Sequence, residues 1–360
     1  MPTSIKINGR PVGGGAPAYL VAEMSANHGG DYSRAVKIVE EAKAAGADAI
    51  KLQTYTADTL TIQSDKEFFR IGAGSLWEGR RLYDLYQEAH TPWEWHPKLK
   101  EVADRLGLDF FSSPFDATAV DFLEKLEVPC FKIASFEIVD IPLIQRVART
   151  GKPMILSTGL ATPDEISEAL RAARDHVARE VALLKCTSAY PAKPEEMNLR
   201  AIPAMAQLFD VPIGLSDHTM GIAVSVAAVA MGACLIEKHF TLSRAIPGPD
   251  SSFSLEPQEF KSLVEAVRTT EKSLGRAEFV LGAGEMANRG LRRSLFVVRD
   301  MAAGDPFTEE TVRSIRPGDG LPPRHLPEVL GQRAVRAIRR GTPLNWELVG
   351  LVPPAARPPK

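Results

Sequence analysis

Two histidines in consecutive apolar runs are the first sign of chemistry in this sequence. His218 closes the run 212–218, and His239 lies in the next run, 234–242. If the two runs are neighbouring strands of a parallel sheet, both imidazoles could bind one divalent metal ion. A lone buried histidine is more often a structural group, but a pair leaves positions for water and a substrate oxygen, which favours a Lewis-acid role. Mn²⁺ is the expected ion, with Co²⁺, Zn²⁺ or Mg²⁺ as alternatives.

Further polar side chains stand at or just beyond the ends of all eight apolar runs. They are Glu23, Lys51, Gln53, Ser113, Lys132, Ser135, Ser157, Ser188, Tyr190, Ser216 and Glu237. Singly, each has an ordinary interpretation, such as a solvated lysine or a serine that caps a helix. Two lysines and several serines that face one pocket would suit a small phosphorylated or carboxylated anion, because a buried lysine pair is costly without one.

Glu23 is the candidate general base or proton shuttle, because it stands alone among apolar neighbours and burial raises a carboxyl pKa toward neutrality. An ion pair with Lys51 or Lys132 is the structural alternative, and both can hold at once. The remaining histidines are expected in turns, in loops or at the surface. They are His28, His90, His96, His176 and His325.

The elements that must position these residues follow a repeated pattern. Eight apolar runs cover residues 18–23, 47–54, 109–115, 130–135, 153–159, 181–188, 212–218 and 234–242. Segments with helical periodicity lie between most of them, at 32–45, 91–106, 140–150, 163–177, 198–209 and 221–231. Eight buried strands that alternate with helices predict a (β/α)8 TIM barrel over residues 17–275. An open doubly wound sheet is the alternative, but no GxGxxG motif follows the first strand.

The segments before and after the predicted barrel, and one long connection within it, lack the pattern of alternating strands and helices. Residues 1–16 predict a β-hairpin around Asn8-Gly9, and the long connection 55–90 is expected to form part of the active-site wall. A linker is expected at 276–291, a small β-rich domain at 292–352 and a disordered tail at 353–360. In the small domain, residues 298–312 match residues 335–349 at an offset of 37, which predicts internal pseudo-symmetry.

Bulk composition excludes several classes of protein. A formal net charge of −2 gives no global attraction to nucleic acid or acidic membranes, and no apolar segment reaches the length of a membrane span. Cys130, Cys186 and Cys234 lie in apolar runs without CxxC spacing, which indicates buried reduced thiols. A cytoplasmic protein is expected.

Seven motifs carry the candidate residues. They are Ala22-Glu23-Met24-Ser25-Ala26-Asn27-His28, Lys51-Leu52-Gln53-Thr54, Ser112-Ser113-Pro114-Phe115, Lys132-Ile133-Ala134-Ser135, Ser157-Thr158-Gly159, Gly214-Leu215-Ser216-Asp217-His218 and Ile236-Glu237-Lys238-His239-Phe240. Together they resemble the nonulosonic (sialic) acid synthase family over almost the whole chain. That family joins a TIM barrel to a C-terminal antifreeze-like (SAF) domain, which residues 291–349 resemble.

The resemblance implies an enzyme, a transferase that condenses phosphoenolpyruvate with an N-acetylated amino sugar in its open-chain aldehyde form and releases phosphate. It implies that the metal on His218 and His239 polarises the aldehyde. A phosphoenolpyruvate cradle is implied at Lys51, Ser113, Lys132, Ser135, Ser157, Ser188 and Ser216. Sugar contacts are implied at Glu23, Gln53, Tyr190, Asp250 and Arg316.

Family members are domain-swapped homodimers, so Arg316 would reach the sugar bound to the partner. A nucleic-acid surface is the alternative use of the arginine-rich C-terminal region, but no aromatic residues are interleaved with the arginines. The motif around Glu23 and the residues 248–254 resemble the pseudaminic acid branch, whose sugar is a 2,4-diacetamido-2,4,6-trideoxy-L-altrose. A legionaminic or N-acetylneuraminic acid synthase and a non-catalytic sugar-binding protein are the alternatives.

Overall fold

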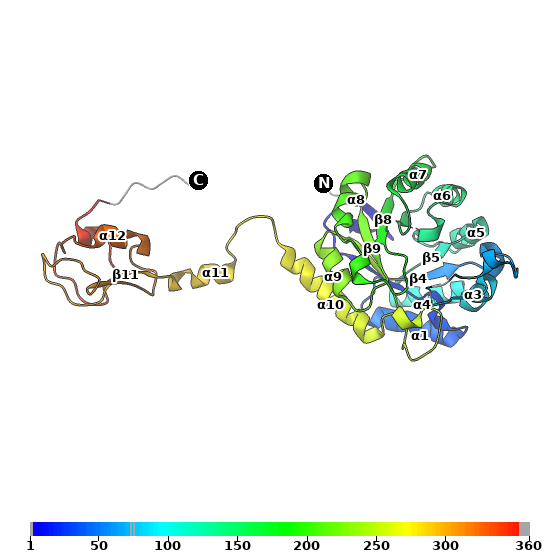
Figure 1. Ribbon diagram of the computed structural model, residues 1–360, viewed down its shortest axis with the longest axis horizontal. Helices are drawn as coiled ribbons and strands as arrows, with labels where there is room; N and C mark the ends of the chain where they lie inside the picture. The colour runs from blue at the N-terminus through cyan, green and yellow to red at the C-terminus, as the bar shows by residue number, and fades with distance from the viewer. Residues whose placement is uncertain (1–2, 73, 75, 177, 353–360) are drawn as a thin grey trace. The chain divides into compact units, whose positions relative to one another are not determined.

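The computed structural model describes residues 3–72, 74, 76–176 and 178–352. The chain divides into two compact units, Met1–Gly275 and Arg276–Lys360, which Figure 1 shows and which are described separately below. Among the described residues, no helix has the length and apolar character that crossing a membrane requires.

The first unit is a closed barrel of eight parallel strands in the order β10-β3-β4-β5-β6-β7-β8-β9. The strands are β3 (Tyr19–Glu23), β4 (Ala49–Thr54), β5 (Asp109–Pro114), β6 (Phe131–Ile133), β7 (Met154–Ser157), β8 (Val181–Cys186), β9 (Ile213–Asp217) and β10 (Leu235–His239). The pairing of β10 with β3 closes the barrel, so the (β/α)8 prediction is confirmed and the open sheet is excluded.

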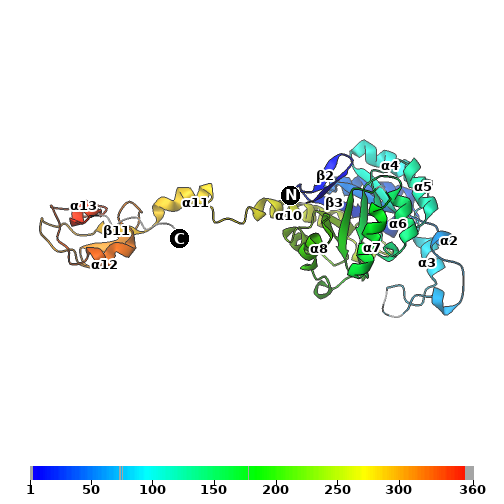
Figure 2. The same cartoon turned by 90° about the horizontal axis from the view of Figure 1, so that it is seen from above.

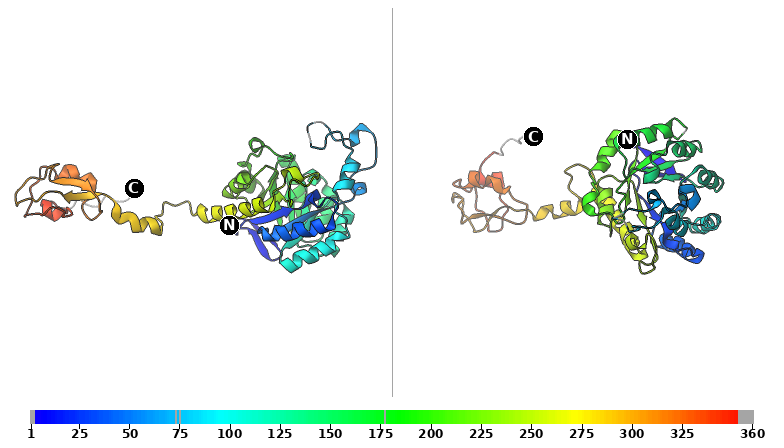
Figure 3. Two further views of the ribbon diagram at one scale, coloured as in Figure 1. Left: turned by 90° about the horizontal axis from the view of Figure 1, so that it is seen from below. Right: turned by 45° about the vertical axis from the view of Figure 1, so that its right-hand side comes forward.

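In the described part of this unit, the helices that follow the strands lie outside the barrel (Figures 1 and 3). They are α1 (Tyr32–Ala44), α4 (Trp95–Leu106), α5 (Ala117–Lys125), α6 (Ile141–Ala148), α7 (Pro163–Arg174), α8 (Ala201–Phe209), α9 (Ala223–Ala230) and α10 (Pro257–Leu274). Their starts are encoded locally. Asp31 accepts hydrogen bonds from two backbone N–H groups at the start of α1, and Thr162 with Glu165 forms a capping box around Pro163 in α7.

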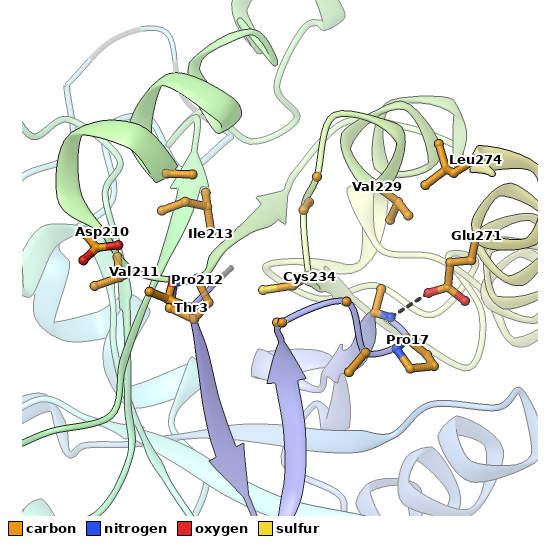
Figure 4. A pocket seen from close by; sticks show the side chains of 18 residues that line it. Thr3, Pro17, Asp210, Val211, Pro212, Ile213, Val229, Cys234, Glu271 and Leu274 are labelled. Atoms are coloured by element: carbon orange, nitrogen blue, oxygen red, sulfur yellow. Dashed lines mark hydrogen bonds between the residues drawn. The ribbon is translucent and has the colours of Figure 1, made fainter. Parts of the chain in front are cut away.

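The predicted hairpin consists of β1 (Ser4–Ile7) and β2 (Arg10–Gly13), which pair antiparallel. Asn8 and Gly9 turn the chain with positive φ angles of 48° and 76°, as a type I′ turn requires. The apolar side chains of the hairpin join the barrel core at its N-terminal end. A pocket of about 430 Å³ lies there, between the segment 13–18 that follows the hairpin and the starts of β9 and β10 (Figure 4). None of the predicted site residues lines this pocket.

The long connection 55–90 carries α2 (Ala57–Leu60), a 3₁₀ turn at Glu67–Phe69 and α3 (Leu82–Ala89). Figure 2 shows the stretch between α2 and α3 projecting from the barrel. Two of its aromatic side chains contact residues that follow barrel strands: Tyr86 packs against Tyr55, and Trp77 packs against Tyr190. The connection is therefore a structured part of the barrel rim.

The second unit contains α11 (Ala283–Asn288), β11 (Ser294–Val297), β12 (Val312–Ile315), α12 (Leu326–Val329) and α13 (Trp346–Val349), with short 3₁₀ turns at Arg289–Leu291 and Pro323–His325. Strands β11 and β12 pair antiparallel over a separate apolar core. The segment predicted as a linker thus contains a short helix. The predicted tail at 353–360 lies outside the described residues.

The predicted repeat of 37 residues is a real symmetry of this unit. Met301 and Ile338, which are 37 positions apart, exchange two backbone hydrogen bonds of 2.8 and 2.9 Å. Two further backbone bonds of 2.8 Å map onto each other at the same offset, Gly304 N to Ala334 O and Gly341 N to Val297 O. The two halves of the small domain therefore pair about a local pseudo-twofold axis.

His28 is a turn residue, as predicted; it lies buried in the 3₁₀ turn Ser25–His28, where its Nε2 lies 3.0 Å from Thr91 Oγ1. The predictions for two other histidines are wrong. His96 is buried on the face of α4 that packs against the barrel, because it lies on the same side of the helix as the core residue Leu99. His325 is buried against Trp346, with ring centroids 4.9 Å apart.

Candidate active site

The candidate residues gather at the C-terminal ends of the barrel strands. Successive side chains of a strand point to opposite faces, so residues two positions apart share the barrel interior. Lys51 and Gln53 of β4 obey this rule, and so do Glu237 and His239 of β10. The barrel mouth is where (β/α)8 enzymes carry their catalytic groups.

Two lysines and two glutamates form a buried cluster in this interior. Lys51 Nζ lies 2.7 Å from Glu23 Oε2 and 3.5 Å from Glu237 Oε1. Lys132 Nζ lies 3.4 Å from the same oxygen of Glu237. All four side chains are at most 7% exposed, so their charges must compensate one another. The ion pair expected as the structural alternative for Glu23 is therefore present.

Burial also has the expected effect on the acid–base chemistry of Glu23. Burial is the main cause that raises the pKa of Glu23 to about 6, and the charge of Glu237 adds to it, while Lys51 opposes it. Burial lowers the pKa of Lys132, although Glu237 opposes the change. Burial also acts to lower the pKa of Lys51, but Glu23 and Glu237 raise it on balance. Glu23 can thus exchange a proton near neutral pH while paired with Lys51.

Glu237 is the site residue to which the sequence assigned no role. Its Oε1 accepts a hydrogen bond of 3.4 Å from Ser216 Oγ in addition to its contacts with both lysines. Its Oε2 is buried and has no hydrogen-bond partner among the described residues. Alternation in β10 could have revealed it, because a glutamate two positions before an inward histidine must also point inward.

The serines converge on the same space. Ser113 accepts a hydrogen bond of 3.4 Å from Lys51 Nζ. Ser135 and Ser188 both face Gly159, because a Cβ atom placed on this glycine would lie 2.7 and 2.2 Å from their hydroxyl oxygens. Ser157 Oγ is buried without a hydrogen-bond partner in the described part of the chain. Ser135 and Ser188 therefore meet beside Gly159, and Ser157 keeps unused hydrogen-bonding capacity.

His218 and His239 lie side by side, as predicted. They follow and end the paired strands β9 and β10, and their ring centroids are 5.4 Å apart. His218 Nδ1 donates a hydrogen bond of 3.0 Å to Thr187 O, which leaves Nε2 unprotonated in the neutral ring. Burial lowers the pKa of His239 well below its ordinary value, and its Nδ1 has no partner among the described residues.

This pair fits a divalent metal that keeps open positions for water and substrate. Imidazole binds metals in its neutral form, which burial favours for His239, and the orphaned nitrogen of His239 is a buried polar atom that a ligand would satisfy. Within the described ranges, no group of three or more His, Cys, Asp and Glu side chains is arranged to hold a metal ion.

One cysteine adjoins the histidine pair. Cys186 Sγ lies 4.0 Å from His218 Nδ1 and 3.8 Å from Ser188 Oγ. All three cysteines are free thiols; Cys130 and Cys186 are buried as expected, whereas Cys234 is half-buried. The sequence did not place Cys186 in the site.

The residues expected on the sugar side form a second network beside the histidines. Gln53 Nε2 donates to Glu23 Oε1 at 3.3 Å and to Ser25 Oγ at 3.0 Å, and Ser25 Oγ donates to buried Asp250. The Tyr190 ring lies 4.4 Å from that of His218. Arg316, the remaining predicted contact, is exposed in the second unit.

Comparisons with known proteins agree with this site. Residues 38–279 match the NeuB family, and residues 292–349 match the SAF domain. The chain is 45% identical to the pseudaminic acid synthase of Campylobacter jejuni, over 91% of this chain and 95% of that protein. It is 38% identical to the N,N'-diacetyllegionaminic acid synthase of Legionella pneumophila, over 96% of this chain and 99% of that protein.

A solved structure of a sialic acid synthetase is also similar to this chain. The N-acetylneuraminic acid synthetase of Leptospira borgpetersenii, crystallised with citrate, superposes with a TM-score of 0.72 at 33% identity, over 80% of this chain and 95% of that one. The chain therefore belongs to the NeuB family of phosphoenolpyruvate-dependent nonulosonic acid synthases.

Proposed function

We propose that this nonulosonic acid synthase is a cytoplasmic pseudaminic acid synthase. It would condense phosphoenolpyruvate, water and the open-chain aldehyde of 2,4-diacetamido-2,4,6-trideoxy-β-L-altropyranose to give pseudaminic acid and phosphate. The observation that carries this choice of sugar is the 45% identity, over 91% of the chain, to a pseudaminic acid synthase, against 38% to a legionaminic acid synthase.

The buried lysines support binding of phosphoenolpyruvate. Lys51 and Lys132 are held inside the barrel by Glu23 and Glu237, and the buried Ser157 hydroxyl has no hydrogen-bond partner within the described chain. A phosphate or carboxylate placed among these groups would receive charge-assisted hydrogen bonds in a region of low dielectric. The residues that would form this phosphoenolpyruvate cradle are Lys51, Ser113, Lys132, Ser135, Ser157, Ser188 and Ser216.

The condensation forms one C–C bond and breaks one C–O bond. C3 of phosphoenolpyruvate attacks the aldehyde carbon, and a water oxygen forms a new bond to C2. The aldehyde oxygen takes up the proton that this water gives up by way of Glu23, and the bond between C2 and the bridging oxygen breaks as phosphate leaves. Glu23 would accept the proton that water loses, because its pKa near 6 allows it to be a carboxylate at neutral pH. Gln53, Tyr190 and Asp250 would orient the sugar beside it.

Enzymes of this family use a divalent metal. His218 and His239 would hold it, and Mn²⁺ is the ion we propose. When bound, it would supply Lewis acidity toward the aldehyde oxygen.

A domain-swapped homodimer is part of the proposal. Four large apolar side chains on the loops around the barrel mouth are at least half exposed, which is typical of a surface that another chain covers; they are Phe136, Val139, Leu160 and Met220. The SAF domain of a partner would cover this rim, and its Arg316 would contact the sugar.

Phosphate release decides between the candidate sugars. The full-length protein is incubated with Mn²⁺, phosphoenolpyruvate and either the diacetamido-trideoxy-altrose, its legionaminic counterpart or N-acetylmannosamine. Turnover is expected with the first sugar at the highest kcat/KM. Turnover with N-acetylmannosamine alone would refute the proposed substrate, and no turnover with any sugar would support a non-catalytic sugar-binding protein.

Removing the Ser157 hydroxyl tests the anion cradle. Ser157→Ala is expected to weaken phosphoenolpyruvate binding by about tenfold, since a hydrogen bond to a charged group contributes roughly 1.5–3 kcal/mol. The same change should leave the melting temperature unchanged, because this hydroxyl makes no hydrogen bond within the described chain. Calorimetric titration measures the affinity, and the half-buried Ser262→Ala on the outer helix α10 is the control. Equal affinity in both variants would remove Ser157 from the cradle.

Truncating Trp77 tests the sugar-side wall. The Trp77 indole donates a hydrogen bond of 3.1 Å to Pro249 O, next to Asp250, and its ring centroid lies 5.7 Å from that of Tyr190. Trp77→Ala is expected to raise KM for the sugar by about tenfold, because an aromatic contact contributes roughly 0.5–1.5 kcal/mol beyond its buried area. KM for phosphoenolpyruvate should not change. A variant with both constants raised equally would indicate general damage to the rim.

A further inference from the structure

An ion pair is buried in the barrel wall directly behind the two histidines. Lys238 Nζ lies 2.8 Å from Asp217 Oδ2, and the two side chains are 1% and 0% exposed. The chemistry proposed above uses neither residue. Burying an ion pair costs desolvation free energy unless hydrogen bonds satisfy both charges. The contacts of this pair therefore indicate which parts of the structure it fixes.

The pair lies on the outer face of the barrel strands. Ser216 and Glu237 contact each other inside the barrel, so the residues that follow them on β9 and β10 point outward. Helix α9 covers the pair there, and its Ser225 donates a hydrogen bond of 2.6 Å to Asp217 Oδ2. The ion pair thus joins two strands and the helix that connects them.

The register places this pair one position before each histidine. Lys238 and Asp217 are direct partners in the parallel ladder between β10 and β9. His239 follows the first of them, and His218 follows the second. Any slip or splay of these strands would therefore change the ion pair and the separation of the imidazoles together.

Further contacts fix the turn that carries His218. The other carboxylate oxygen, Asp217 Oδ1, accepts hydrogen bonds of 2.8 Å from both Thr219 N and Thr219 Oγ1. Lys238 Nζ donates a bond of 2.6 Å to Thr219 O. His218 is therefore held between two residues that the ion pair fixes, and one of these bonds reaches across from the strand of His239.

We infer that Asp217 and Lys238 are positioning residues that set the separation and orientation of His218 and His239 for metal binding. This inference rests on the proposed function, because it assumes that the two imidazoles share a divalent ion. Residues that support and orient metal ligands change the metal affinity although they do not contact the metal themselves. The ion pair does so through the backbone of the two strands.

Titration of Mn²⁺ alone into metal-stripped, full-length protein tests the inference, with free Mn²⁺ followed by electron paramagnetic resonance. Lys238→Met leaves the Asp217 charge buried and unpaired, so its melting temperature should fall. The double variant Asp217→Asn, Lys238→Met removes both charges, and most of that loss should be recovered. Both variants should bind Mn²⁺ about 10- to 100-fold more weakly than the wild-type chain. If the single variant does not fold, the double variant carries the test.

A matched control comes from the opposite end of the barrel. Arg268 NH2 lies 3.3 Å from Asp48 Oδ2, far from the histidines along the strands, and Arg268→Met should leave Mn²⁺ affinity unchanged. A double variant that recovers both melting temperature and Mn²⁺ affinity would overturn the inference, because the pair would then be purely structural. Mn²⁺ binding that survives the substitution His218→Ala would refute the shared metal site, and the inference with it.

Discussion

Replacing Glu23 by glutamine is expected to lower kcat by about 10²- to 10⁴-fold, the usual contribution of a positioned general base. Glutamine keeps the shape and the contact with Lys51 but cannot accept a proton. Phosphoenolpyruvate should bind at least as tightly as before, because the change removes one negative charge 2.7 Å from Lys51. Steady-state phosphate release and a calorimetric titration with phosphoenolpyruvate measure the two effects separately.

The pH profile gives this prediction a second readout. The pKa of Glu23 is about 6, so the carboxylate that accepts a proton is lost below this pH, and wild-type kcat/KM should fall tenfold per pH unit there. Glu23→Gln should lack this limb. The contribution of Glu23 to folding stability changes with pH in the opposite direction, since it is larger at low pH. A carboxyl whose pKa is raised on folding contributes stability below pH 4.5, and this contribution is lost as pH rises through 6.

The control for Glu23 is a carboxylate at the other end of the barrel. Glu271 accepts a hydrogen bond from Ala18 N and pairs with Arg268 beside the N-terminal pocket. Glu271→Gln should leave kcat and the pH profile unchanged. Normal turnover in Glu23→Gln would dismiss Glu23 as the proton acceptor, whatever its pKa.

The barrel and most of its mouth could be predicted from the sequence because two periodicities are local. Apolar runs give the strands, and alternation within each strand decides which side chains face inward. Lys51, Gln53, His218 and His239 could be predicted because they stand at or near the ends of these runs. A polar residue that ends a buried strand has no packing role, so its presence indicates chemistry.

The sequence could not show which groups satisfy one another. Glu237 reads as one more strand-end residue until the barrel closes and brings both lysines to its Oε1. The same limit applies to Lys238, which pairs with Asp217 across strands instead of facing solvent. The prediction for His96 was wrong because a polar residue in an amphipathic helix is usually expected on the exposed face. In the structure, His96 Nε2 instead lies 2.9 Å from Thr54 Oγ1 in the barrel wall.

Replacing His239 by alanine is expected to lower kcat by about 10²- to 10⁴-fold without unfolding the chain. A Lewis acid contributes several kcal/mol to a reaction of this kind, and each 1.4 kcal/mol is a factor of ten in rate. The Nδ1 of His239 makes no hydrogen bond within the described chain, so its removal breaks none. His218→Ala should lower kcat similarly but also cost about 1 kcal/mol of stability, because it loses the hydrogen bond to Thr187.

Metal removal and restoration separate this effect from damage to the barrel. Treating the wild-type enzyme with a chelator should abolish phosphate release, and MnCl₂ should restore it. His239→Ala should not respond to the same MnCl₂ concentration, whereas His176→Ala, at the end of α7 and away from the mouth, should respond fully. Activity that survives stripping in the wild-type chain, or restoration of the His239 variant to the wild-type rate, would refute the metal site. Restoration confined to chains with both imidazoles would show that the pair on β9 and β10 acts as one site.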